Sequence, residues 1–99
     1  MNRDSILETL EAHRDQLRAL GLHRIGLFGS HARGETRQGS DLDFLVEFAP
    51  GAKTFDNYMD LKAILEDLFG APVDLVILET LKARLREGIL RETVYAPGF

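Results

Sequence analysis

Three short apolar segments alternate with stretches of helical spacing along this chain, and that alternation limits the folds open to it. The segments predicted as strands are residues 22–28, 42–48 and 73–78. Apolar residues at helical spacing occupy residues 5–20, 58–69 and 81–94, with a helical turn expected at 30–33. The pattern predicts an α/β (mixed α+β) chain, in which helices flank a small mixed β-sheet.

The expected helix ends follow from capping residues. Ser5 and Glu8 stand three positions apart, as in a capping box, which predicts that the first helix begins at Ser5. Gly21 stands where a left-handed residue would stop that helix, and Gly70 has the same place after the central helix.

Length and composition exclude several classes of protein. The chain has 99 residues and no cysteine, so a single domain spanning residues 1–99 is expected, and disulfide scaffolds and thiol chemistry are excluded. No apolar run is long enough for a signal peptide or a membrane span. We therefore expect a cytoplasmic protein that does not act at a membrane.

The middle of the chain is acidic. Residues 40–79 carry nine carboxylates against two lysines, a local balance of −7 in a chain whose net charge is −4. Such a segment repels a nucleic-acid backbone. Direct binding of nucleic acid is therefore not expected.

Asp41 and Asp43 interrupt the apolar segment at the start of the second predicted strand. On a strand, residues two apart point to the same face, with Cα atoms about 6.6 Å apart. Two carboxylates so placed repel each other unless a hard cation such as Mg²⁺ lies between them. The alternative is structural: one aspartate caps a turn while the other lies at an exposed strand edge.

A glycine and a serine follow the first predicted strand. Gly29 and Ser30 open a turn whose backbone N–H groups can bind phosphate, and Arg33 can pair with a phosphate or with a nearby aspartate. Taken alone, such a turn is common and needs no ligand. His31 is expected to be an exposed histidine at the start of the turn; the alternative is that it touches the nucleotide.

Asp74 is the one polar residue in the third apolar segment. A buried, unpaired carboxylate is costly, so a partner is expected for it. If its strand adjoins residues 42–48, Asp74 supplies a third oxygen ligand for a two-metal site that binds a triphosphate. The alternative is a solvated carboxylate on an edge strand.

Residues 29–46, GSHARGETRQGSDLDFLV, resemble the signature of the DNA-polymerase-β-like nucleotidyltransferase superfamily. Within it, the segment is similar to minimal nucleotidyltransferase (MNT-type) antitoxins. The resemblance implies the nucleotidyltransferase fold, two Mg²⁺ ions, ATP as substrate and a HEPN-type toxin as partner. It also implies three catalytic and metal-binding carboxylates, Asp41, Asp43 and Asp74. The expected nucleotide-binding residues are Gly29, Ser30, Arg33 and Ser40.

Three functions remain open at this point. The first is transfer of AMP from ATP to a tyrosine hydroxyl of the toxin, and the second is an antitoxin that neutralises its partner by contact alone. The third is transfer to a small molecule such as an antibiotic. Only 25 residues follow Asp74, too few for a second domain that would hold a small acceptor, so a protein acceptor is favoured.

Overall fold

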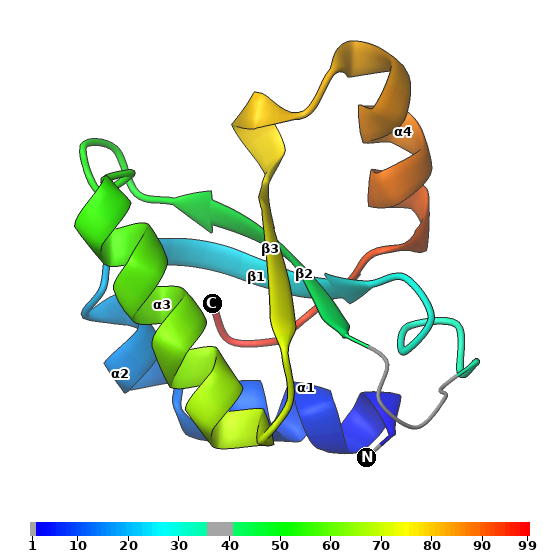
Figure 1. Cartoon of the computed structure of the whole chain (residues 1–99), viewed down its shortest axis with the longest axis horizontal. Helices are drawn as coiled ribbons and strands as arrows, with labels where there is room; N and C mark the ends of the chain where they lie inside the picture. Colours follow the sequence, from blue (N-terminus) through cyan, green and yellow to red (C-terminus); the bar gives the residue numbers. More distant parts are fainter. Residues whose placement is uncertain (1, 36–40) are drawn as a thin grey trace.

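The computed structural model describes residues 2–35 and 41–99 of the chain (Figure 1). No helix in these two stretches is long and apolar enough to cross a membrane. The elements, in chain order, are α1 (Arg3–Ala12), α2 (Arg14–Arg18), β1 (Leu22–Phe28), β2 (Leu42–Phe48), α3 (Phe55–Phe69), β3 (Val73–Ile77), the 3-10 turn η1 (Leu78–Thr80), α4 (Ala83–Glu92) and β4 (Val94–Tyr95).

The strands form one four-stranded mixed sheet in the order β3-β2-β1-β4. β1 runs antiparallel to both β2 and β4, whereas β2 and β3 run parallel and are joined through α3. The expectation of a small mixed sheet flanked by helices is confirmed. The parallel pair brings two of the predicted site residues together, because its register places Asp43 opposite Asp74.

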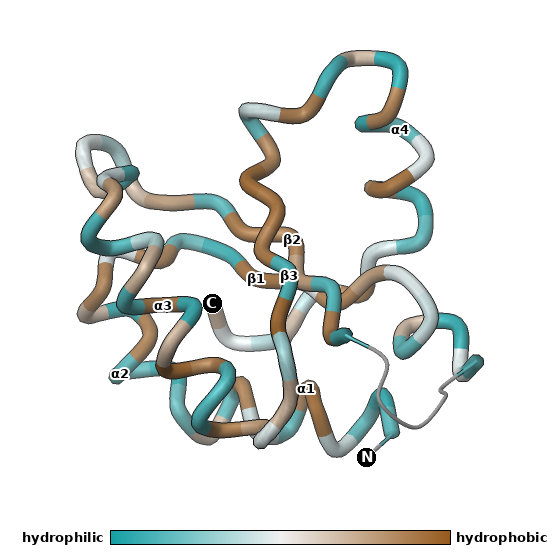
Figure 2. The backbone as a smooth tube through the Cα atoms, in the orientation of Figure 1, coloured by the Kyte–Doolittle hydropathy of each residue, from teal (hydrophilic) through white to brown (hydrophobic). Residues whose placement is uncertain are grey.

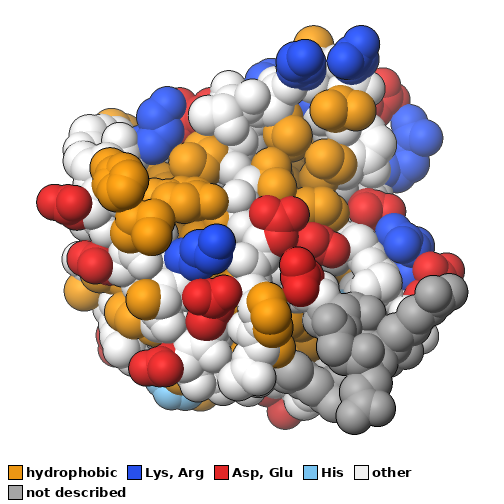
Figure 3. All heavy atoms as spheres, viewed as in Figure 1, with side chains coloured by type: hydrophobic (Ala, Val, Ile, Leu, Met, Phe, Trp, Pro, Cys, Tyr) orange, Lys and Arg blue, Asp and Glu red, His pale blue; other side chains and the backbone are white. Residues whose placement is uncertain are grey.

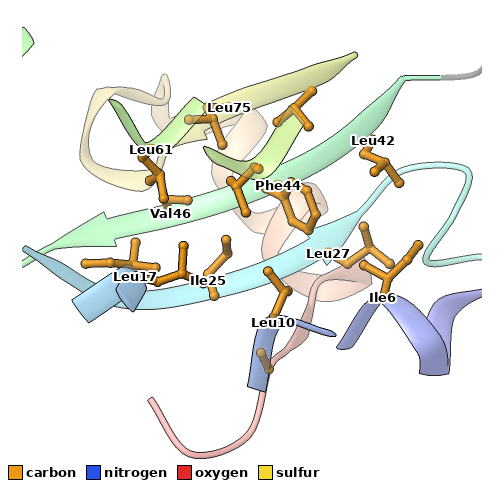
Figure 4. Packing of buried hydrophobic residues seen from close by; sticks show 14 of the residues in the cluster. Ile6, Leu10, Leu17, Ile25, Leu27, Leu42, Phe44, Val46, Leu61 and Leu75 are labelled. Carbon is orange, nitrogen blue, oxygen red and sulfur yellow. The ribbon is translucent and has the colours of Figure 1, made fainter. Parts of the chain in front are cut away.

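One face of the sheet carries the hydrophobic core. The alternating residues Leu42, Phe44 and Val46 of β2 are fully buried, and they pack with side chains from α1, α2 and α3 (Figure 4). In Figure 2, hydrophobic stretches of the strands are interrupted by hydrophilic ones, and the two kinds alternate along the helices. The other face of β2 presents Asp43 and Glu47 on either side of the buried Leu45, and a polar site can form there at the Asp43 end.

The first helix begins earlier than the capping box at Ser5 predicts, and that prediction is wrong. Asn2 is the N-cap: its side chain accepts a hydrogen bond from the Ser5 N–H at 2.8 Å, and the Ser5 hydroxyl accepts from the Asn2 N–H at 3.2 Å. Asparagine caps a helix as well as serine does, so Ser5 falls in the first turn instead. The helix also breaks at His13, after which the short α2 continues to Arg18.

The chain after β3 differs most from expectation. The predicted helix over 81–94 ends at Glu92, and the residues after it form β4, which pairs with Gly26 and Leu27 of β1. α4 buries none of its residues and stands at the upper right of Figure 1, away from the other helices. The helical turn expected at 30–33 is a hydrogen-bonded turn and not a helix, with the Arg33 N–H donating to the Gly29 carbonyl at 3.2 Å.

Candidate active site

Two of the three predicted carboxylates lie side by side on neighbouring strands. Asp43 of β2 and Asp74 of β3 are register partners in the parallel pair, so their backbones are separated by the interstrand spacing of about 4.8 Å. The residues next to them in each strand, such as Phe44 and Leu75, belong to the core, so alternation places both aspartates on the opposite face. Acidic side chains gather in the middle of the face shown in Figure 3, where β3 crosses in front of β2 in Figure 1.

Asp41 precedes the first residue of β2 and is exposed. Partial burial raises the pKa of Asp43 above its ordinary value of 3.8, and the negative charges of Asp74 and Asp41 raise it further. The charges of the other two predicted carboxylates therefore both reach Asp43.

The turn after β1 lies directly against Asp43. Gly29 has φ +76°, a left-handed conformation that side-chain-bearing residues rarely adopt. A Cβ placed on Gly29 would overlap Oδ2 of Asp43 and lie 3.1 Å from its Cγ. Phe28, the residue before the glycine, is the register partner of Asp43 on the other side of β2. The predicted phosphate-binding turn and the predicted metal carboxylates are thus adjacent.

Arg33 leaves this turn and pairs with glutamates. Its Nε donates to Glu35 at 3.1 Å and its Nη1 donates to Glu92 at 3.0 Å; these hydrogen bonds raise the pKa of the guanidinium. Within the protein, its partners are therefore glutamates and not the nearby aspartate that the sequence offered as the alternative to a phosphate. Ser30 is half-buried in the same turn, and its carbonyl accepts from the Glu35 N–H at 2.9 Å. Ser40 lies outside the described residues.

His31 departs from its expected exposure, because only 5% of its surface is accessible. The chain turns within residues 30–34 instead of continuing as a helix, and this turn carries the imidazole inward. Its Nδ1 is buried without a hydrogen-bond partner among the described residues. The ring is close enough to Asp43 to act on it electrostatically, in the direction that lowers the pKa of that carboxyl. His31 therefore belongs to the surroundings of the site.

Glu92, the last residue of α4, is a member of the site that the sequence did not indicate. Its Oε1 accepts a hydrogen bond from the Gly29 N–H at 3.1 Å, across 63 positions of sequence. No motif or periodicity marks this glutamate. It comes to the turn because β4 leads the chain back along β1, and β4 was itself unexpected.

The donor set suits a divalent cation. Among the residues that the structure describes, no group of three or more histidines, aspartates or glutamates is already close enough to hold a metal ion. Even so, Asp43 and Asp74 are like-charged neighbours in register, and the pKa of Asp43 is raised partly by that proximity. Carboxylate oxygens are the ligands that Mg²⁺ takes, and a cation between them would relieve the repulsion.

Known proteins match most of this chain in sequence and in fold. The family model described as "Nucleotidyltransferase domain" matches residues 10–96. Protein adenylyltransferase MntA of Thermococcus cleftensis is 40% identical over 93 residues, which cover 93% of each chain. A solved structure described as a candidate minimal nucleotidyltransferase is 44% identical, covers 95% of each chain and superposes with a TM-score of 0.74. A toxin–antitoxin complex with AMP-PNP is 26% identical over all of this chain and 75% of its own, with a TM-score of 0.72. The chain therefore belongs to the nucleotidyltransferase domain family.

Proposed function

We propose that this protein is an antitoxin that transfers AMP from ATP to a tyrosine hydroxyl of a HEPN-type toxin. The observation that carries the proposal is the pairing of Asp43 with Asp74 in register, directly beside the Gly29 turn. This arrangement sets a candidate cation site next to a candidate phosphate site, which is what a nucleotidyl transfer requires.

The comparisons support the nature of the acceptor and of the nucleotide. The Thermococcus relative that is 40% identical is a protein adenylyltransferase, and the relative that is 26% identical is a toxin–antitoxin complex with an ATP analogue. The HEPN class of the partner is what the resemblance of residues 29–46 to MNT-type antitoxins implies.

Different residues of the chain would bind the triphosphate and the metal. We propose that the backbone N–H of Gly29 and the hydroxyl of Ser30 bind the triphosphate, with Arg33 and Ser40 as further phosphate contacts. Asp41, Asp43 and Asp74 would hold Mg²⁺, which neutralises the phosphate charge and makes the acceptor hydroxyl more acidic. The side chain of Asp74 is exposed, so an acceptor can approach it.

The transfer itself is an in-line displacement. The acceptor oxygen forms a bond to the α-phosphorus, and the bond from that phosphorus to the bridging oxygen breaks, so pyrophosphate leaves. Asp74 accepts the proton that the acceptor hydroxyl loses. The modified toxin gains a phosphodiester charge and a purine beside a site that must accept RNA, and its ribonuclease activity should fall.

Intact-mass spectrometry of the toxin tests this function. The purified toxin is mixed with this protein, ATP and Mg²⁺, and the expected result is a mass increase equal to one or more AMP groups. The Asp41→Ala/Asp43→Ala double variant should give no increase. Asp60→Asn, which removes one exposed carboxylate from α3, is the matched control and should transfer AMP normally.

Toxin activity, measured on RNA in the same mixtures, separates the proposal from its alternative. Inhibition should appear only where the mass increases. If the toxin stays unmodified and is inhibited equally by the wild type and by the double variant, the protein neutralises its partner by contact and the proposed transfer is wrong.

A further inference from the structure

Glu92 holds the two groups of the turn that a phosphate would need. Its Oε1 accepts from the Gly29 N–H at 3.1 Å, and its Oε2 accepts from Arg33 Nη1 at 3.0 Å. One oxygen of the carboxylate is therefore bound by a backbone amide and the other by a guanidinium. Phosphate oxygens are bound by the same two kinds of donor.

While the Gly29 N–H donates to Glu92, it cannot donate to a phosphate oxygen in the same position. We infer that Glu92 is a further residue of the nucleotide site: its carboxylate takes the position of a phosphate on Gly29 and Arg33, and the triphosphate must displace it. The inference rests on the proposed function, since it assumes that Gly29 binds the triphosphate, and it adds a residue that sets the affinity for that ligand.

Charge gives Glu92 a second effect on the nucleotide. The site already holds three aspartates, and the charge of Glu92 contributes to the raised pKa of Asp43. A triphosphate that enters the turn meets this fourth carboxylate at close range. Like charges repel, so the nucleotide binds less tightly than the amide and the guanidinium alone would allow.

The surroundings of Glu92 permit its displacement. The side chain is 32% exposed, so its carboxylate can turn to solvent without becoming a buried, unpaired charge. α4 buries no residue, and the strand that follows it has only two residues. A movement at the end of α4 therefore disturbs little of the apolar packing.

Isothermal titration calorimetry on the Glu92→Gln variant tests the inference. The probes are ATP and inorganic tripolyphosphate, each with Mg²⁺. Glutamine keeps the size of the side chain and removes its charge, so the bond to Arg33 is weakened. We expect about tenfold tighter binding of both probes, the equivalent of one charge-assisted hydrogen bond that no longer has to be broken. Glu87→Gln is the matched control, because Glu87 lies on the same helix and pairs with Arg91 instead; its affinities should equal those of the wild type.

Thermal unfolding without nucleotide distinguishes this role from a structural one. Loss of the Glu92 contacts should leave the melting temperature of the free protein equal or lower while nucleotide affinity rises, whereas a merely structural role would lower both. Equal or weaker binding by Glu92→Gln, no binding by either protein, or a gain seen with ATP and not with tripolyphosphate would overturn the inference. AMP transfer is not measured here, so failure of the proposed function would show separately, as an unmodified toxin.

Discussion

Replacing Asp43 by asparagine should make the metal-free protein more stable. Asp43 and Asp74 lie opposite each other on adjacent strands, where two unit charges about 5 Å apart repel by about 0.8 kcal/mol in water and by about 3 kcal/mol at an effective dielectric constant of 20. Because Asp74 is exposed and solvent screens the pair, we expect a value near the lower limit, about 1 kcal/mol. In a domain of this size, 1 kcal/mol raises the melting temperature by about 4–8 °C.

Thermal unfolding followed by circular dichroism, at pH 7 in the presence of EDTA, measures this effect. Asp60→Asn removes a carboxylate from the exposed side of α3 and should leave the melting temperature unchanged. Addition of Mg²⁺ should raise the melting temperature of the wild type more than that of Asp43→Asn, because only the wild type keeps the full carboxylate pair. If Asp43→Asn melts at the same temperature as the wild type in EDTA, or lower, the repulsion inferred from the register does not exist.

Three further predictions concern the same region. Gly29→Ala should lower the free energy of unfolding by about 1–2 kcal/mol because Gly29 has a positive φ, and by more if the Asp43 carboxylate cannot move aside. Urea unfolding measures this change, and unchanged stability would contradict the geometry of the turn. Ser30→Ala should weaken ATP binding by about 1.5–3 kcal/mol, the value of one hydrogen bond to a charged group, and equal affinities by calorimetry would place the phosphate elsewhere. The folded protein holds the proton of Asp43 more tightly than the unfolded chain does. The stability of the wild type should therefore fall relative to that of Asp43→Asn as the pH rises from 3.8 through the raised pKa, and then level off. A stability difference between the two proteins that shrinks as the pH rises would contradict this.

The elements that build the sheet could be predicted because local pattern decides them. β1 and β2 have the bounds that their apolar segments indicate, and β3 ends one residue earlier than expected. The alternation in β2 also showed which face carries Asp43. These elements pack directly against the core, so burial and local propensity favour the same structure.

The C-terminal part could not be predicted in the same way. Val94 and Tyr95 form a strand only because β1 offers them a free edge. Their partners lie 67 and 69 positions earlier in the chain, and two residues are too few to show a periodic signal. Glu92 is brought to the site by this return of the chain, and His31 is placed by the turn after β1. Their contributions to the site are tertiary, whereas those of Asp41, Asp43 and Asp74 follow from strand alternation and from a motif.

The weak attachment of α4 has a consequence for how the molecule opens. The helix is held between two anchored points: β3 at one end, and at the other Ala96, which is buried and donates its N–H to the Ile25 carbonyl at 2.9 Å. Melting α4 between these points exposes little apolar surface, so it should cost far less free energy than global unfolding. The amides of α4 should therefore exchange with solvent deuterium through local opening, whereas those of β1 and β2 should exchange only through global unfolding. We therefore expect the segment that carries Glu92 to open as a cooperative unit of its own.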